Sequence, residues 1–272
     1  MYEAYWQLDA KPFECTSDVR FYYPGESHQA ALLKLRYAIE NKREAALLAG
    51  PAGTGKTLLI AALARLLPAH CQPLVHVVFP QMPPDQLVAY ITNELTGETA
   101  AQPESIERNI RRLQHVLREN VAAKRQAVLV VDEAHLLRDT IALETLRLLL
   151  NLQVDGAPAM TMVLVGQTVL LPALDRQPEL DERLGVKCLL RRFELEETMA
   201  YVSHRLSAAG AKRPIFDTTA LEAVHHLSHG VARQINRLCD LALLIGYADE
   251  RPGLAAAQIE AVADELVTVA PE

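Results

Sequence analysis

The chain has 272 residues, half of them hydrophobic, and a formal net charge of -7. This length and composition allow a full hydrophobic core, with room for one large domain and a smaller one. The negative charge excludes general attraction to polyanions, so any nucleic-acid contact has to come from a local basic patch. The wide spacing of the cysteines excludes a zinc motif or a redox pair and favours thiols in a reducing compartment. They are Cys15, Cys71, Cys188 and Cys239.

The sequence predicts a protein without a membrane span. No uninterrupted apolar run reaches the ~18 to 20 residues that a span needs. The opening segment, Met1 to Trp6, lacks a basic region followed by an apolar one, as a secretory signal would have. We therefore expect a cytoplasmic location.

Short apolar runs alternate with helical patterns from residue 45 onward. Five runs predict strands buried on both faces, because they are apolar throughout: 45–49, 74–79, 127–131, 160–165 and 186–190. The helical patterns between them cover 56–67, 84–96, 105–123 and 140–152. Repeated strand-helix units with right-handed crossovers predict a three-layer α/β sandwich around a parallel five-stranded sheet.

The strand pattern stops after about residue 192, and only helical periodicity follows. It covers 196–208, 218–228, 231–247 and 255–265. The sequence therefore predicts a small all-helical C-terminal domain. We place the domains at 1–193 and 194–272, with the first helix beginning near Leu195.

A phosphate-binding loop is predicted directly after the first strand. The segment Gly-Pro-Ala-Gly-Thr-Gly-Lys-Thr matches G-x-x-x-x-G-K-[ST] and precedes the helix that begins near Lys56. Its glycines let backbone N–H groups point at phosphate oxygens, and the helix N-terminus adds partial positive charge. We expect Lys56 to reach the β- and γ-phosphates and Thr57 to bind Mg²⁺. The expected nucleotide contacts are Gly50, Pro51, Ala52, Gly53, Thr54, Gly55, Lys56, Thr57 and Leu58.

Two adjacent carboxylates follow the strand 127–131. They belong to the string Asp132-Glu133-Ala134-His135, at the strand end where open α/β sheets bind ligands. Asp132 is expected to hold Mg²⁺ through water, and Glu133 to polarise the water that attacks the γ-phosphate. The same string occurs in helicases, but 272 residues leave no room for a second motor domain.

Further segments carry a family resemblance. They are the opening Met1 to Trp6 with Lys11-Pro12-Phe13, then 21–24 with 27–32, Val163 to Gln167, and Leu227 to Asp240. With the two acidic residues and the phosphate loop, these segments resemble the AAA+ ATPases, and more narrowly the ExeA-like, general secretion pathway A-type group. The resemblance covers nearly the whole chain. It implies a P-loop NTPase core with a helical lid.

The resemblance also implies roles for residues outside the two acidic positions and the loop. Gln167 matches the sensor 1 position, although it also suits a simple strand-end cap. Arg233 matches the sensor 2 arginine of the lid, although it also suits a surface position on a helix. The family's second glycine and its proline are replaced here by His229 and Ala232, so the turn before the lid helix is expected to differ.

Arg183 is the best match to the arginine finger that a neighbouring subunit inserts, and Arg176 competes for this role. The segment with Tyr22, Tyr23, Pro24 and His28 resembles the part of related ATPases that packs near adenine; its aromatic rings are equally suited to a core.

The resemblance implies an oligomeric, Mg²⁺-dependent ATPase that assembles or regulates a secretion, pilus or exopolysaccharide export system. Family members commonly continue into a membrane segment and a peptidoglycan-binding domain. This chain ends at Glu272, so we expect it to act through protein partners of an envelope machine. A nucleotide-binding scaffold that hydrolyses little ATP is a less favoured hypothesis, because the residues expected for hydrolysis, Lys56, Asp132 and Glu133, are all present.

The alternative is a DNA-binding ATPase similar to the TnsC and TniB transposition regulators. Its local support is the helix 105–123, where basic side chains gather opposite apolar ones: Arg108, Arg111, Arg112, His115 and Arg118. Glu104 and Glu107 lie four residues before two of these arginines and can pair with them. A solvated, ion-paired face is therefore the preferred interpretation.

Overall fold

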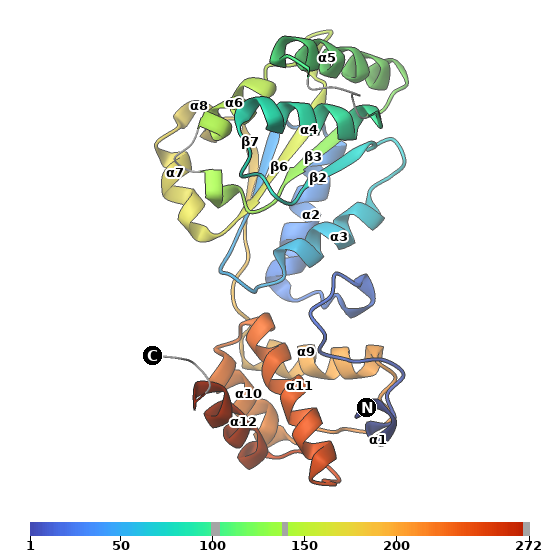
Figure 1. The fold of residues 1–272 in the computed structure, drawn as a ribbon, viewed down its shortest axis with the longest axis vertical. Helices are drawn as coiled ribbons and strands as arrows, with labels where there is room; N and C mark the ends of the chain where they lie inside the picture. The colour runs from blue at the N-terminus through green and yellow to red at the C-terminus, as the bar shows by residue number, and fades with distance from the viewer. Residues whose placement is uncertain (99–103, 138–140, 269–272) are drawn as a thin grey trace. The chain divides into compact units, whose positions relative to one another are not determined.

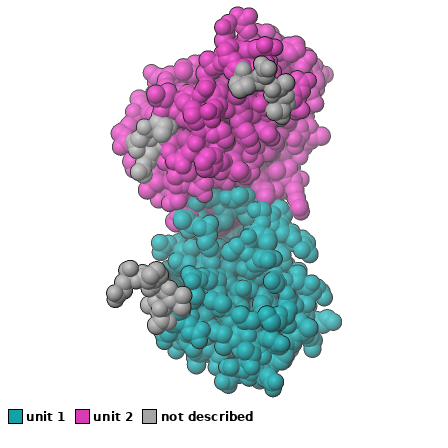
Figure 2. All heavy atoms as spheres, viewed as in Figure 1, with its two compact units in different colours: residues 1–26, 52–58, 191–272 teal, residues 27–51, 59–190 magenta. Residues whose placement is uncertain are grey.

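The computed structural model describes residues 1–98, 104–137 and 141–268, which form two compact units (Figure 2). The α/β unit contains residues 27–51 and 59–190, and the helical unit contains 1–26, 52–58 and the described chain from Arg191 onward. Compared with the expected domains 1–193 and 194–272, these units group the N-terminal segment with the C-terminal helices.

The α/β unit is built on a parallel five-stranded sheet in the order β2-β3-β6-β1-β7. The strands are β1 (Ala45–Ala49), β2 (Leu74–Val77), β3 (Ala127–Val131), β6 (Met160–Gly166) and β7 (Leu184–Leu189). This confirms the predicted fold class. The strand expected over 74–79 ends at Val77, since Val78 and Phe79 are exposed beyond it.

Helices cover both faces of this sheet (Figure 1). They include α2 (Glu26–Glu40), α3 (Lys56–Leu66), α4 (Pro84–Thr96), α5 (Ile106–Ala122) and α6 (Ile141–Leu149). The chain steps across the sheet in one direction from β1 to β2 and in the other from β2 to β3. Right-handed crossovers therefore place α3 on one face and α4 on the other. Helix α2 was not predicted from the sequence.

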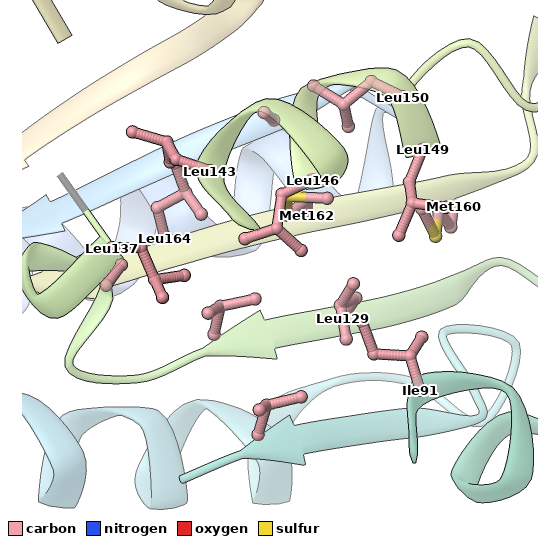
Figure 3. Packing of buried hydrophobic residues seen from close by; sticks show 14 of the residues in the cluster. Ile91, Leu129, Leu137, Leu143, Leu146, Leu149, Leu150, Met160, Met162 and Leu164 are labelled. Carbon is pink, nitrogen blue, oxygen red and sulfur yellow. The ribbon is translucent and has the colours of Figure 1, made fainter. Parts of the chain in front are cut away.

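The main apolar core lies between the sheet and the helices α4 and α6 (Figure 3). Leu143 and Leu146 of α6 lie over Met162 and Leu164 of β6, and all four side chains are fully buried. On the same side, Ile91 of α4 lies near Leu129 of β3. Burying one such side chain contributes roughly 1.5 to 3 kcal/mol, so this cluster fixes the positions of the strand ends.

Several short elements complete the α/β unit and were not predicted. They are η2 (Ala134–Leu137), β4 (Gln153–Val154), β5 (Ala157–Pro158), η3 (Thr168–Leu170), α7 (Leu171–Asp175) and α8 (Pro178–Asp181). The strands β4 and β5 form an antiparallel hairpin. Its two turn residues, Asp155 and Gly156, both have positive φ, as a two-residue hairpin turn of this kind requires.

The helical unit contains the predicted C-terminal helices. These are α9 (Leu195–Ala208), α10 (Thr218–Ser228), α11 (Ala232–Ala248) and α12 (Ala256–Thr268). A capping box between Glu194 and Glu197 begins α9, and the Asp217 carboxylate begins α10 by accepting from the N–H of Ala220 at 2.8 Å. Among the described residues, no helix is long and apolar enough to cross a membrane.

The N-terminal segment, with α1 (Glu3–Trp6) and η1 (Val19–Phe21), is part of the helical unit's core. The Trp6 side chain is buried, and its Nε1 donates to the carbonyl of Leu243 at 2.9 Å. The buried Arg205 donates from Nε to the carbonyl of Pro12 at 2.5 Å and from Nη2 to that of Glu14 at 2.9 Å. Contacts between residues far apart in sequence thus hold this segment.

Candidate nucleotide-binding site

The predicted phosphate loop follows β1 and leads into α3. Strand β1 is buried along its whole length, and the loop begins where the N–H of Gly50 donates to the carbonyl of Gly166 at 3.2 Å. Gly53 and Gly55 have φ of 75° and 87°, in the left-handed region that favours glycine. Thr54 and Lys56 are both buried, at 2% and 7% exposure. The local backbone thus has the strand-loop-helix form that suits phosphate binding.

Within the helical unit, the loop contacts the beginning of α11. The N–H of Arg233 donates to the carbonyl of Gly53 at 3.1 Å. A Cβ atom on Gly53 would lie 2.9 Å from Cβ of Arg233 and 3.1 Å from Cγ1 of Val231. Glycine is therefore required here for space as well as for its φ. The expected lid arginine is thus next to the loop, with an exposed side chain.

The turn before α11 accommodates both departures from the family pattern. His229 ends α10 in the left-handed conformation, φ 50°, that a glycine commonly adopts at a helix C-terminus. Gly230 also has positive φ, and a Cβ on it would lie 2.0 Å from the carbonyl oxygen of Phe193. Ala232 occupies the first helical position of α11, where proline is common. The turn before α11 therefore forms without the glycine and the proline of the family pattern, with some backbone strain at His229.

The two expected carboxylates follow β3 in the α/β unit. Asp132 is 4% exposed; its Oδ1 accepts from the N–H of Glu133 at 2.9 Å, and its Oδ2 lies 3.3 Å from Nε2 of His76. Glu133 has φ 50° and a side chain that is 45% exposed, with Oε2 3.2 Å from Nδ1 of His135. One carboxylate is thus buried and held, and the next points toward solvent.

Gln167 follows β6, the strand between β1 and β3. The carbonyl of Gln167 accepts from the N–H of Leu170, and this bond closes the turn of η3. The N–H of Gln167 points at Nδ1 of His135 at 3.5 Å. Its side chain makes no capping bond to η3. The sheet therefore places Gly50, Asp132, Glu133 and Gln167 at the carboxyl ends of adjacent strands. Sequence reasoning gave no role to His76 or His135. The only signal for His135 was its place two residues after Glu133, and His76, 56 positions before Asp132, carried none.

A family model described as an AAA domain matches residues 39–174, about half of the chain. The chain belongs to the AAA+ ATPases. It is 34% identical over 256 residues to general secretion pathway protein A of Aeromonas hydrophila, which confirms the ExeA-like resemblance. That match covers 91% of this chain but 45% of the relative, so the chain spans less than half of the relative's length.

Solved AAA+ structures share the fold. The ORC2 protein of Aeropyrum pernix, in its ADPNP-ADP complexes, has a TM-score of 0.72 at 16% identity, covering 97% of this chain and 73% of that one. Cdc6p of Pyrobaculum aerophilum has a TM-score of 0.68 at 18% identity, covering 96% and 74%. At these identities the similarity shows the fold alone.

The expected arginine finger, Arg183, lies at the opposite end of β1 from Gly50, where the phosphate loop begins. Arg183 precedes β7, whose first residue pairs with Ala45, whereas the loop follows Ala49 at the other end of β1. Five strand residues span about 16 Å. The Nη2 of Arg183 donates to Oδ1 of Asn151 at 2.7 Å, and its Nε lies 3.7 Å from Glu44. The competing Arg176 ends α7 and is exposed.

The aromatic segment before α2 contributes to the core of the helical unit. The Tyr23 ring lies 5.6 Å from that of Phe193 and 5.9 Å from that of Tyr201, both nearly edge-on. Burial raises the pKa of Tyr22 to about 12. His28 is buried in α2. The core interpretation therefore accounts for Tyr23.

The basic face of α5 forms ion pairs, in agreement with the preferred interpretation of its sequence. Arg108 pairs with Glu104 at 2.9 Å, and Arg111 pairs with Glu107 at 2.6 Å. The same Glu104 also accepts from Arg112 at 3.0 Å. This helix therefore offers less positive charge to a polyanion than its sequence alone indicates.

The residues suit a Mg²⁺-nucleotide. The left-handed glycines and the start of α3 provide a cradle of N–H donors, with Lys56 for phosphate charge. The Thr57 hydroxyl and the Asp132 carboxylate each carry oxygen atoms, the class of ligand that Mg²⁺ prefers.

Proposed function

We propose that this AAA+ chain binds ATP with Mg²⁺ at the phosphate loop and hydrolyses it. The observation that carries the proposal is the shared edge of the sheet: the loop leaves β1, and Asp132 and Glu133 leave β3 with only β6 between them. Ligands bind at this edge in open α/β sheets. In this proposal Gly50–Leu58 holds the phosphates, and Thr57 and Asp132 hold the metal.

Glu133 is proposed to orient and polarise the attacking water. Its side chain is 45% exposed, so it is accessible to water, whereas Asp132 is buried. Bound Mg²⁺ neutralises charge on the phosphates, and Lys56 does the same at the β- and γ-positions. Gln167, at the next strand end, is suited to hold the same water, and Arg233, beside Gly53, to report the state of the nucleotide.

Arg183 is proposed to act in the site of a neighbouring subunit. Its position at the amino-terminal end of β7 is at the opposite end of β1 from Gly50, where the phosphate loop of its own chain begins. A finger supplied in trans requires an oligomer, closed as a ring or open as a helix. We propose that nucleotide-dependent assembly is how this protein controls its partners.

The export role rests on the relative from Aeromonas hydrophila, whose name places it in the general secretion pathway. We propose an assembly or regulatory ATPase for an export system, with protein partners in the envelope. The DNA-binding alternative is less supported, because Arg108, Arg111 and Arg112 of α5 are paired with Glu104 or Glu107.

A mixing experiment tests the proposed mechanism. Glu133→Gln subunits keep the finger and lose the water-orienting carboxylate, whereas Arg183→Ala subunits keep the carboxylate and lose the finger. Each variant alone should hydrolyse ATP at least about 100-fold more slowly than the wild type, and a mixture should regain activity. Arg176→Ala is the matched control. The assignment of Arg183 is wrong if the mixture stays inactive. It is also wrong if Arg176→Ala, and not Arg183→Ala, slows hydrolysis alone and restores it when mixed with Glu133→Gln.

A further inference from the structure

His135 lies between Glu133 and Gln167, two residues with proposed roles in hydrolysis, and has no assigned role itself. It sits in η2, one residue beyond Ala134, and its side chain is 11% exposed. Its Nδ1 lies 3.2 Å from Oε2 of Glu133 and 3.5 Å from the backbone nitrogen of Gln167. One nitrogen atom therefore faces an acceptor on one side and a donor on the other.

That nitrogen can serve only one of these partners at a time. A neutral imidazole nitrogen that carries hydrogen donates, and one without hydrogen accepts. With hydrogen on Nδ1, His135 binds the Glu133 carboxylate; without it, Nδ1 accepts from Gln167 and turns a lone pair toward that carboxylate. Both distances exceed the ~2.9 Å of a typical bond, as expected for an atom placed between two competing partners.

Glu133 needs such a restraint. Its left-handed backbone is a strained conformation for a residue with a side chain, and nearly half of that side chain is exposed. A carboxylate in this position samples several rotamers unless a neighbour holds it. The end of β6, on the other side, packs closely against η2: a Cβ on Gly166 would lie 3.1 Å from the backbone nitrogen of His135. The backbone at the end of β6 therefore leaves little room for a side chain beside η2.

We propose that His135 is a positioning residue that holds Glu133 for hydrolysis and couples it to the end of β6 by exchanging the carboxylate for the N–H of Gln167. This inference rests on the proposed function, because it assigns to Glu133 the role of orienting the attacking water. A small displacement of Gln167 changes which bond Nδ1 makes, and thereby releases or holds the carboxylate. The imidazole stays neutral in this exchange, because the hydrogen that leaves Nδ1 is replaced by one on Nε2 through proton exchange with water.

Two nearly isosteric substitutions test this role. The His135→Asn side chain can donate to Glu133 and accept from Gln167 through separate atoms, whereas the His135→Asp side chain can only accept and repels the carboxylate. His115→Asn is the matched control, because His115 forms an exposed pair with Glu119 at 3.3 Å on α5. For each variant, kcat at saturating MgATP and the Kd of a fluorescent ATP analogue are measured.

We expect kcat to remain within about threefold of wild type in His135→Asn and His115→Asn, and to fall roughly 10- to 100-fold in His135→Asp, with Kd changed less than about twofold. In a Glu133→Gln background, His135→Asp should have no further effect, because the two residues act as a unit. Equal kcat for His135→Asn and His135→Asp, or additive losses with Glu133→Gln, would overturn the proposal. A wild-type chain that binds the analogue but does not hydrolyse ATP contradicts the proposed function and, with it, this role of His135.

Discussion

Replacing Arg205 should loosen the N-terminal segment from the helical unit. Arg205 is 2% exposed, donates to the carbonyls of Pro12 and Glu14 and to the hydroxyl of Tyr201, and lies 4.7 Å above the ring of Phe21. Arg205→Met keeps the length and apolar contact of the side chain but removes all of these donors. A hydrogen bond from a charged group contributes ~1.5 to 3 kcal/mol, and a buried carbonyl left without a donor costs ~1 to 3 kcal/mol. Since such terms are not additive, we expect a loss of about 3 to 5 kcal/mol.

Urea unfolding followed by the fluorescence of Trp6 measures this loss. Trp6 is the single tryptophan of the chain and is buried in the same unit. Arg237→Met, an exposed arginine of α11, is the matched control and should change the free energy of unfolding by less than about 0.5 kcal/mol. If Arg205→Met loses less than about 1 kcal/mol, these bonds do not hold the N-terminal segment and the reasoning is refuted.

Three further predictions concern the loop and the helical unit. Gly53→Ala forces a side chain into φ 75° beside Arg233 and should lower the free energy of urea unfolding by about 1 to 2 kcal/mol; an unchanged midpoint would contradict the geometry. ATP at about 100 times its Kd should stabilise the wild type by ~2.7 kcal/mol in a thermal-shift assay and leave the melting temperature of Lys56→Ala unchanged; equal shifts would exclude the loop as the site. Burial, with a smaller effect of His226, lowers the pKa of His225 below its ordinary 6.5. The neutral His225 side chain therefore contributes to the stability of the folded state above pH 6.5, and this contribution is lost as the pH falls through the lowered pKa. The acid-side loss of stability should therefore be smaller in His225→Asn, and identical pH profiles would refute this.

The sequence predicted the parts of the fold that are determined locally. The runs 45–49 and 127–131 match β1 and β3 because central parallel strands are apolar on both faces. Helix α2 was missed because its pattern is mixed: Ala38 and Ile39 are buried, whereas Leu33 and Tyr37 are 71% and 49% exposed. The helices of the lid were predicted from their helical periodicity, and in the structure caps such as Asp217 mark where they begin.

Features that depend on contacts distant in sequence were not predictable. Trp6 and Leu243 meet across 237 positions, so the sequence could not assign the N-terminal segment to the helical unit. The phosphate loop could be predicted because its motif consists of consecutive residues. The contact of Gly53 with Arg233, and the place of His135 between Glu133 and Gln167, arise only when separate elements fold together.

The most direct test of the account is steady-state ATP hydrolysis measured against protein concentration, with and without duplex DNA, for the wild type and Glu133→Gln. We predict that the rate per subunit rises with concentration, is unaffected by DNA and falls at least about 100-fold in Glu133→Gln. Hydrolysis that requires DNA, or that persists in Glu133→Gln, would contradict an oligomeric AAA+ ATPase that works through protein partners.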